Sequence, residues 1–470
     1  MKTNHGKCSE VRIAYIGGGS HGWAWTFLKD LAREEELSGV IDLYDIDQPM
    51  AEQNAVIGTR LFERQEVKGD WKFEVSSSLK ELLEKHPEFV IISILPGTLD
   101  HMESDVHLPE KYGIYQSVGD TTGPGGLVRA LRTIPMFVEI AEAIKAYCPE
   151  TLVINYTNPM SLCVKTLYHV FPQIKAFGCC HEVFGTQKVL RNLYEMATGE
   201  TGVGREEVIV NVQGINHFTW FDRASCRGVD LFPVYRRFID EHFEDGYHDP
   251  DRNWMNGTFN CAHRVKMDLF NKYGNIAAAG DRHLAEFMPG DMYLKDPEQV
   301  RAWKFALTTV AWRKERQAEK NAQAIRLASG QEQIELEATG EEGILLIKAL
   351  CGLGRMVSNV NIPNTNGQIP NLPRTAVVET NAVFYQGTIQ PVFAGEMKPT
   401  VRDLVMPHVV NHERILEAAL KPNFGLALDA FMDDPLVKGR ISREDGAALL
   451  REMIKNTLDI LPEEWQNEVK

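Results

Sequence analysis

The stretch VRIAYIGGGSHG, residues 11–22, decides the fold of the first part of the chain. Its first half is rich in β-branched and aromatic side chains, which is typical of a buried strand. Gly17, Gly19 and Gly22 follow with the spacing G-x-G-x-x-G, and the residues after them have helical periodicity. A strand, a glycine-rich turn and a helix in this order predict a dinucleotide site, because the backbone can approach a pyrophosphate at the helix N-terminus. The alternative is a turn that only packs the helix on the strand.

A second apolar run, VIDLYDID (residues 40–47), strengthens this prediction. It places Asp45 at a strand end roughly 20 residues beyond the glycines, where an acid that binds the ribose is expected. An acid there favours a free 2′-hydroxyl, and therefore NAD⁺ over NADP⁺, although a solvated strand-end acid is the alternative. We assign the cofactor site to Gly17, Gly18, Gly19, Ser20, Asp45, Pro96 and Asn155.

Strand-like and helix-like segments alternate as far as about residue 200. Residues 89–97, 151–159 and 174–180 are apolar runs typical of strands, and residues 136–148 have the pattern of a helix. This alternation predicts a parallel sheet that helices cover on both faces, with ligands bound beyond the carboxyl ends of the strands. The residues at such ends include Asn155, Asn158 and Cys180.

The pattern changes in the second half of the chain. Two β-rich runs join at GINH (residues 214–217), residues 231–330 are mostly helical, and residues 361–395 become strand-like after a Pro- and Asn-rich segment. We therefore predict an α/β protein in which a Rossmann-type parallel-sheet domain, residues 1–200, is followed by an α+β domain, residues 201–470. This is the layout of lactate and malate dehydrogenases, and the second domain is expected to hold substrate, metal and the oligomer interface.

Composition excludes several classes of protein. The chain has 470 residues and a formal charge of −15, which argues against nucleic acid or an anionic membrane as the main partner. Neither a signal peptide nor an apolar run long enough to cross a membrane is visible, so we expect a cytoplasmic protein. The eight cysteines are scattered and form no C-x-x-C pair, which argues against a disulfide framework and a structural zinc site.

Two polar pairs follow strand-like runs: Cys180-His181 in GCCHEV and Asn216-His217 in GINHF. If the thiolate of Cys180 and the imidazole of His217 converge, they provide two ligands for a divalent ion and leave other positions open for substrate oxygens. The alternatives are a small buried cysteine and a histidine that binds the backbone.

Two further stretches combine glycines with charged residues. GDTTGPGGLVRALRTIP (residues 119–135) is either a second anion-accepting loop or an ordinary loop that caps the following helix. In AAAGDRHLAEF (residues 277–287), the triplet Asp281, Arg282 and His283 combines groups that carry out acid–base chemistry and bind an anion. The alternative for Asp281 is a helix N-cap.

The sequence resembles glycoside hydrolase family 4, the NAD-dependent glycosidases, over nearly the whole chain. The resemblance rests on the following stretches in this order: IAYIGGGS, GDTTGPGG, LRTIP, INYTNPM, GCCHEV, GINHF and AAAGDRHLAEF. It implies that Cys180 and His217 bind a divalent ion, usually Mn²⁺, together with hydroxyls of the sugar, and that the thiol stays reduced. It also implies a homodimer or homotetramer.

The mechanism that the resemblance implies is a redox elimination followed by addition. NAD⁺ takes a hydride from C3 of the sugar, and the ketone, polarised by the metal, makes the C2 proton acidic. A base removes this proton, the C1 substituent leaves, water adds and the hydride returns, so that no net oxidation results.

The resemblance also assigns roles to single residues. Asp281 matches the C2 base of the branches that carry an acid there, and Asn158 matches the residue that contacts sugar hydroxyls. His181 stands where phospho-sugar branches carry Asp or Asn as the leaving-group acid, and an imidazole is able to donate a proton near neutral pH.

The motif Cys-His-Glu-Val resembles the branch of α-galacturonidases, which act on α-linked galacturonic acid. A uronate needs a cation, which Arg282 or His283 is able to supply. An α-glucosidase or α-glucuronidase of the same family is the alternative. A further alternative is an NAD-dependent hydroxy-acid dehydrogenase, which would form NADH continuously.

Overall fold

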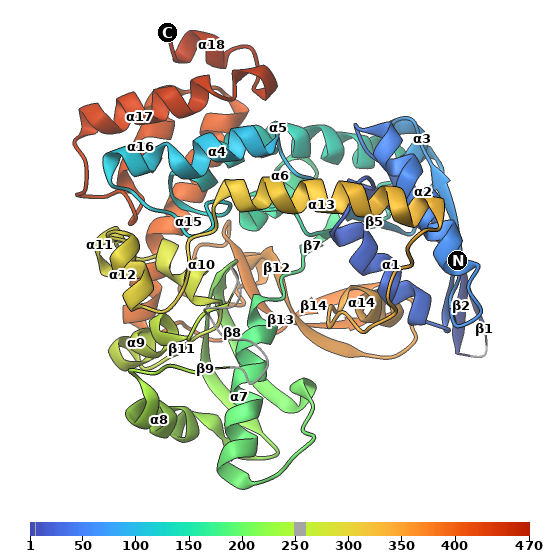
Figure 1. Cartoon of the computed structure of the whole chain (residues 1–470), viewed down its shortest axis with the longest axis horizontal. Coiled ribbons are helices and arrows are strands. Elements are labelled where there is room, and N and C mark those ends of the chain that lie inside the picture. Colours follow the sequence, from blue (N-terminus) through green and yellow to red (C-terminus); the bar gives the residue numbers. More distant parts are fainter. Residues whose placement is uncertain (5, 249–259) are drawn as a thin grey trace.

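A large mixed sheet runs through the first half of the protein (Figure 1). The structure, a computed structural model, describes residues 1–4, 6–248 and 260–470. The parallel part of the sheet has the order β4-β3-β2-β5-β6-β7, which confirms the predicted Rossmann-type fold. The strands are β2 (Lys7–Ile16), β3 (Leu37–Tyr44), β4 (Asp70–Val75), β5 (Phe89–Ile92), β6 (Leu152–Asn155) and β7 (Lys175–Gly178), and β1 (Lys2–Asn4) pairs with β2.

Side chains that alternate along β2 explain why helices cover both faces. Ile13 and Tyr15 belong to a core that includes α1 and α14, whereas Ala14 and Ile16 belong to a core that includes α3, α5 and α6. Strands buried on both faces need this cover, because neither face tolerates water. The helices of this half are α1 (Trp23–Arg33), α2 (Gln48–Phe62), α3 (Leu79–Glu84), α4 (Leu99–His107), α5 (Gly123–Tyr147), α6 (Met160–Val170) and α7 (Glu182–Thr198), and the 3₁₀ helix η1 is Pro109–Tyr112.

Strands from the second half of the chain extend the same sheet. β12 (Met356–Pro363) pairs antiparallel with β7, and β13 (Val377–Tyr385) and β14 (Thr388–Pro391) follow outward. Helix α14 (Gly343–Leu350) packs on the extended sheet. β12 therefore covers the edge of β7, whose backbone groups would otherwise lack partners. Residues predicted to belong to a second domain thus complete the sheet of the first.

A small antiparallel sheet forms the centre of a second lobe, which lies below the large sheet with α7, α8 and α9 in Figure 1. It is built on a hairpin of β8 (Val208–Ile215) and β9 (Phe218–Cys226), which confirms the two β-rich runs joined at GINH. β10 (Val229–Asp230) and β11 (Ile276–Ala277) also pair with β9. The helices around it are α8 (Leu231–His242), α9 (Arg264–Tyr273), α10 (Asp281–Glu286), α11 (Gly290–Tyr293) and α12 (Pro297–Ala302), and the 3₁₀ helix η2 is Arg205–Glu207.

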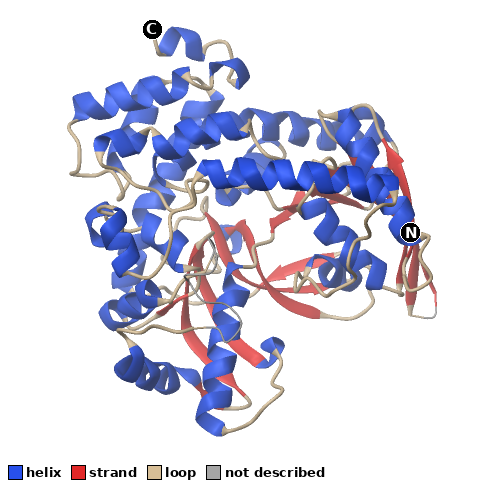
Figure 2. Cartoon of the chain, in the orientation of Figure 1, coloured by secondary structure: helices blue, strands red, loops and turns tan. Residues whose placement is uncertain are grey.

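One apolar core joins the two halves of the chain. Leu131 of α5, Phe218 of β9 and Val405 of α15 all belong to it, so α5 shares one core with the small sheet and the C-terminal helices. Helices predominate at the periphery of the molecule in Figure 2. None of the helices in the described residues is long and apolar enough to cross a membrane. The remaining elements are α13 (Val310–Ser329), α15 (Pro399–Leu420), α16 (Phe424–Asp433), α17 (Arg443–Lys455), α18 (Trp465–Glu468), η4 (Asn364–Asn366) and η5 (Leu458–Ile460).

Candidate active site

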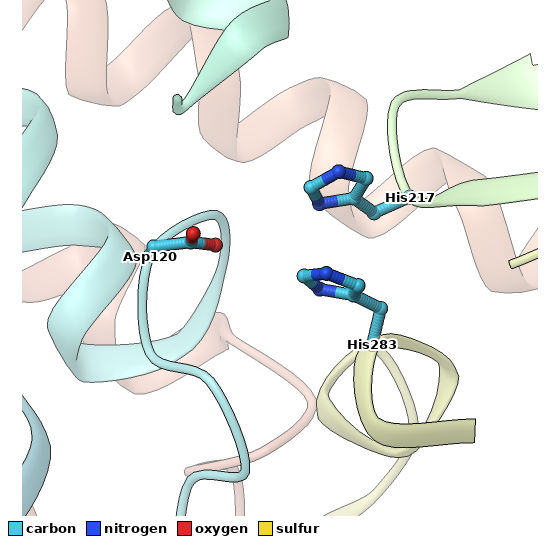
Figure 3. A group of neighbouring side chains, drawn as sticks. All are labelled: Asp120, His217 and His283. Atoms are coloured by element: carbon cyan, nitrogen blue, oxygen red, sulfur yellow. The ribbon is translucent and has the colours of Figure 1, made fainter. Parts of the chain in front are cut away.

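Three side chains that could hold a metal ion converge beyond the carboxyl ends of the parallel strands. Asp120, His217 and His283 place their ligand atoms within 4.8 Å of one another, and their side chains point toward a common space in Figure 3. Asp120 lies in the loop before α5, His217 in the β8–β9 turn and His283 on α10. We call these three residues the imidazole cluster.

His217 is held in a defined orientation. Its backbone takes the left-handed conformation, with φ 62°, in the tight turn between β8 and β9. The Thr121 hydroxyl donates to Asp120 Oδ1 (2.7 Å), so its contact with His217 Nδ1 (2.8 Å) requires Nδ1 to donate. Burial lowers the pKa of His217 to about 3, and the ring is therefore neutral, with the lone pair of Nε2 free for a metal.

Asp120 and Glu182 bring negative charge to the two imidazole rings. Burial would raise the pKa of Asp120, but His283, Arg129 and the other neighbouring groups hold it well below its usual range. Burial would also raise the pKa of Glu182, but the neighbouring histidines lower it to about 2. Glu182 Oε1 lies 3.7 Å from His283 Nε2, whereas His283 Nδ1 has no hydrogen-bond partner in the described residues. Two carboxylates and two imidazoles form a donor set that suits a divalent cation.

Cys180 lies next to this cluster but is not one of its three members. Its thiol is buried and within reach of the Asn216 side chain, and Asn359 Nδ2 donates to its carbonyl at 3.1 Å. Burial raises the pKa of Cys180, and the charges of Glu379 and Glu182 raise it further. The protein alone therefore keeps Cys180 as a thiol, and a bound cation is what would favour the thiolate.

Glu379 and Asn359 are site residues that sequence reasoning missed. Glu379 is 1% exposed on β13 and accepts a hydrogen bond from Asn359 Nδ2 at 2.6 Å, with Asn216 Nδ2 at 3.5 Å. Burial raises the pKa of Glu379 to about 7. The only signal in the sequence was the strand-like pattern of residues 361–395, which gives no sign that β13 joins the edge of β12 beside Cys180.

Asp281 is fully buried and binds the start of another helix. Its carboxylate accepts from the amides of Val265 and Lys266, each at 3.1 Å, so it caps α9 rather than its own helix α10. Burial raises the pKa of Asp281 to about 6, and the charge of Lys266 limits the rise. Lys266 is itself 1% exposed and donates to Thr186 Oγ1 at 2.8 Å.

His181 is exposed and lies apart from the imidazole cluster. Its Nδ1 is 3.3 Å from a carboxylate oxygen of Glu341, and its ring centroid is 5.8 Å from that of Trp23. It stands at the N-cap of α7, one residue before Glu182, so a substrate that reaches Glu182 would pass close to it.

The sugar-binding residues expected from the sequence surround the imidazole cluster. Asn158 Nδ2 donates weakly to Asp120 at 3.4 Å, and its buried Oδ1 has no partner in the described part of the chain. Arg129 Nε donates to the Asn158 carbonyl at 3.0 Å, and Arg282 Nη2 donates to the Ser117 carbonyl at 3.0 Å. Asn158 Oδ1 is thus a free acceptor within the described residues, and its contact with a sugar hydroxyl stays a prediction.

The glycine amides at positions 119, 123 and 125 are already bonded to other parts of the protein. Gly119 N donates to Glu286 Oε1 (2.9 Å), Gly123 N to Asp434 Oδ2 (3.1 Å) and Gly125 N to Gln116 Oε1 (2.8 Å). These acceptors from the protein itself favour the ordinary loop over the anion-accepting loop. What the loop adds to the site is the Asp120 carboxylate.

The glycine loop after β2 has the features that a dinucleotide requires. A Cβ on Gly17, whose φ is +92°, would lie 2.0 Å from the Ser93 carbonyl oxygen, so only glycine fits. Gly19 N donates to Asp45 Oδ2 at 2.9 Å, which fixes the acid beside the loop. A Cβ on Gly22 would meet nothing within 4 Å, so the third glycine is not needed for close packing.

The other predicted cofactor residues shape the surrounding loops. The Asn155 side chain is buried and binds both the amide and the carbonyl of Thr157, each at 3.0 Å. The Pro96 carbonyl accepts from Arg132 Nε at 3.3 Å, and the Ser20 carbonyl accepts from Asn54 Nδ2 at 3.1 Å. A Cβ on Gly18 would lie 2.8 Å from Leu43 Cβ, so this glycine is also tightly packed.

Comparison with known proteins identifies the family. The profile of the Family 4 glycosyl hydrolases matches residues 12–196, and that of their C-terminal domain matches residues 212–437. An α-galacturonidase of Lachnoclostridium phytofermentans is 59% identical over 465 residues, which cover 99% of this chain and 100% of the relative. Another, of Bacillus subtilis, is 51% identical over 449 residues, which cover 95% and 97%.

Solved structures agree with the sequence comparison. A crystal structure from Bacillus subtilis is 50% identical, covers 95% of this chain and 100% of its own, and superposes with a TM-score of 0.90. A 6-phospho-α-glucosidase from gut microorganisms, solved with NAD and Mn²⁺, shares the fold with a TM-score of 0.80 at 19% identity, over 96% of this chain and 99% of its own. The chain therefore belongs to family 4 of the glycosyl hydrolases.

Proposed function

We propose that this protein hydrolyses α-galacturonides, with NAD⁺ and a divalent metal, by redox elimination and addition. The observation that carries the proposal is the imidazole cluster, which lies at the same sheet edge as the glycine loop and beside a buried thiol. The choice of sugar rests on the α-galacturonidases that are 51–59% identical over at least 95% of this chain.

The residues of the chain fit both cofactors. Gly17 and Asp45 provide the close approach and the acid that an NAD⁺ site requires, and when bound this cofactor accepts a hydride from C3 of the sugar. Cys180 and His217 would hold Mn²⁺, with Asp120 close by, and the ion supplies a Lewis acid to the sugar oxygens. In this assignment residues 1–200 bind the dinucleotide, and residues 201–470 supply most of the substrate site.

Asp281 would take the proton from C2 of the sugar. A buried carboxylate with a pKa of about 6 is mostly ionised at neutral pH and yet basic enough to hold a proton. Asn158 Oδ1 would accept a sugar hydroxyl, because it is buried and has no other partner in the described residues. His181 would assist the leaving group, since it is exposed, lies one residue before Glu182 and faces Glu341.

The proposal is tested by release of nitrophenol from nitrophenyl α- and β-glycosides and uronides. The reaction contains NAD⁺, Mn²⁺ and a thiol reductant, and each is then omitted in turn. We expect turnover of the α-galacturonide, lost when any one of the three is left out. Turnover of a neutral α-hexoside instead would reject the substrate and keep the mechanism. Continuous NADH formation from a hydroxy acid, without nitrophenol release, would reject both.

A further inference from the structure

Residues 117–120 connect the start of α10 with the start of α13. The Ser117 hydroxyl donates to the Arg282 carbonyl at 2.5 Å. The Ser117 carbonyl accepts from Arg282 Nη2 and from the Thr308 amide, each at 3.0 Å. Because α13 begins at Val310, these bonds bring its first turn, which carries Arg313, to the side of the loop that holds Asp120.

Two arginines meet beside this segment. Burial lowers the pKa of Arg282, and the neighbouring charge of Arg313 lowers it further. Both cations face Glu286, whose Oε1 accepts from the amides of Val118 (2.7 Å) and Gly119 (2.9 Å). Burial raises the pKa of Glu286 to about 7, so at neutral pH this carboxylate balances only part of the positive charge.

Arg313 also has an unused hydrogen-bond donor. Its Nε is buried and has no partner among residues 1–4, 6–248 and 260–470. Within the same residues no carboxylate oxygen lies within ion-pair distance of its guanidinium, although the charges of Asp120 and Glu286 act on it. A half-buried guanidinium that lacks a direct partner for its buried Nε is unfavourable, and an anionic ligand that reached it would remove this penalty.

We propose that Arg313, with Arg282 beside it, forms the subsite that binds the C6 carboxylate of the galacturonyl unit. This inference rests on the proposed function and adds the residue that selects a uronide over a neutral sugar. Guanidinium groups bind carboxylates in a matching planar geometry, which suits this ligand better than a hydroxymethyl group. His283, the other side chain considered for the uronate, faces the anion Glu182 and belongs to the imidazole cluster, so it is poorly placed for a second carboxylate.

The subsite predicts discrimination of a particular kind. A galacturonide gives Arg313 a charged partner, whereas the corresponding galactoside differs only in carrying CH₂OH in place of the carboxylate. A site that is built to bind a charged group rejects an analogue without it, because the polar groups of the protein then remain unpaired. Removal of the Arg313 guanidinium should therefore abolish the preference for the galacturonide over the galactoside, and it should leave the cleavage reaction itself intact.

The test compares Arg313→Gln with the wild-type protein on two substrates, 4-nitrophenyl α-D-galacturonide and 4-nitrophenyl α-D-galactoside. We expect kcat/KM on the galacturonide to fall on the order of 100-fold, with an equal loss of affinity for free D-galacturonate measured by calorimetry. Galactoside turnover and NAD⁺ affinity should stay within about threefold of the wild type. Arg313→Lys, which keeps the charge but not the planar fork, should lose about tenfold.

The matched control is Arg316→Gln. Arg316 lies on the same helix, is exposed and pairs with Glu319 at 2.6 Å, so we expect wild-type values for this variant. If wild-type protein binds galacturonate and Arg313→Gln binds it equally well, the subsite is wrong and the proposed function stands. Equal losses on both substrates, with a lower Tm, would give Arg313 a structural role and overturn the subsite. A wild-type protein that neither binds galacturonate nor cleaves the galacturonide overturns the proposed function and the subsite together.

Discussion

The glycine loop and the imidazole cluster are built in opposite ways. The loop is one continuous stretch, residues 17–22, and it acts through its backbone, since a Cβ on Gly17 would meet the Ser93 carbonyl. The cluster collects Asp120, His217 and His283 from separate segments and acts through side chains. Substitutions should therefore separate the two regions: backbone changes should remove cofactor binding, and side-chain changes should remove chemistry and leave the cofactor bound.

The largest effect is expected for His217→Ala. Loss of its imidazole would remove a ligand of the proposed metal site, and we expect kcat/KM on the α-galacturonide to fall at least about 1000-fold, with weaker Mn²⁺ binding and unchanged NAD⁺ affinity. Cys180→Ser should behave in the same way. Steady-state kinetics and titrations with Mn²⁺ and NAD⁺ provide the measurements.

The control for this substitution is His242→Ala, which alters an exposed histidine at the end of α8. It should leave all three quantities unchanged. If His217→Ala keeps full activity after metal is removed, the imidazole cluster is not a metal site.

Gly17→Ala should have the next largest effect, and it acts on the other region. The new Cβ would lie 2.0 Å from the Ser93 carbonyl oxygen at a φ of +92°, so the loop must move away from the cofactor position. We expect NAD⁺ affinity to fall on the order of 100-fold and the Tm to drop by several degrees.

Gly22→Ala belongs to the same loop and is the control, since its Cβ would meet nothing within 4 Å. It should bind NAD⁺ as the wild type does. Equal losses in the two variants would mean that the loop as a whole, rather than the close approach at Gly17, determines cofactor binding.

The same contrast explains what could be predicted from the sequence. The strand, the glycine turn and Asp45 are close in sequence, and their spacing is dictated by local geometry, so the Rossmann-type fold could be derived. The hairpin at residues 214–217 was equally local. In contrast, Glu379 and Asn359 reach Cys180 only because β12 joins the edge of β7, and no local pattern specifies which strand covers an edge.

Two further residues escaped prediction for physical reasons. Asp120 was part of a glycine-rich stretch that suggests a site for an anion. Only the structure shows that the loop amides bond to Glu286 and Asp434, which leaves the Asp120 carboxylate to attract a cation. Arg313 lies in a helix with many charges, where a solvated side chain is the ordinary expectation. Its partial burial depends on the packing of α13 against α4, which the helix sequence does not encode.

A smaller effect is expected on the pH dependence. A C2 base must be ionised, so activity should be lost as the pH falls through the pKa of Asp281, about 6. The positive charge of Lys266 lowers this pKa, and Lys266→Met should therefore move the acidic limb of kcat/KM to higher pH, by about one unit. Lys272→Met, on the exposed side of the same helix, should leave the limb in place. An unchanged limb in Lys266→Met would assign the titration to a group other than Asp281.

Asp45→Asn should give the smallest effect and sharpens the comparison within the glycine loop. The Asp45 carboxylate accepts from the amides of Gly19 (2.9 Å) and Asp47 (3.0 Å), and an amide side chain keeps the size and one acceptor but loses the charge. We expect NAD⁺ affinity to fall about tenfold, with NADP⁺ affinity unchanged or improved, because a 2′-phosphate no longer meets a carboxylate. Asp47→Asn, which keeps the N-cap of α2, is the control. If Asp45→Asn weakens NAD⁺ and NADP⁺ equally, Asp45 holds the loop in shape and does not bind the ribose, so that even this side chain would act through the backbone.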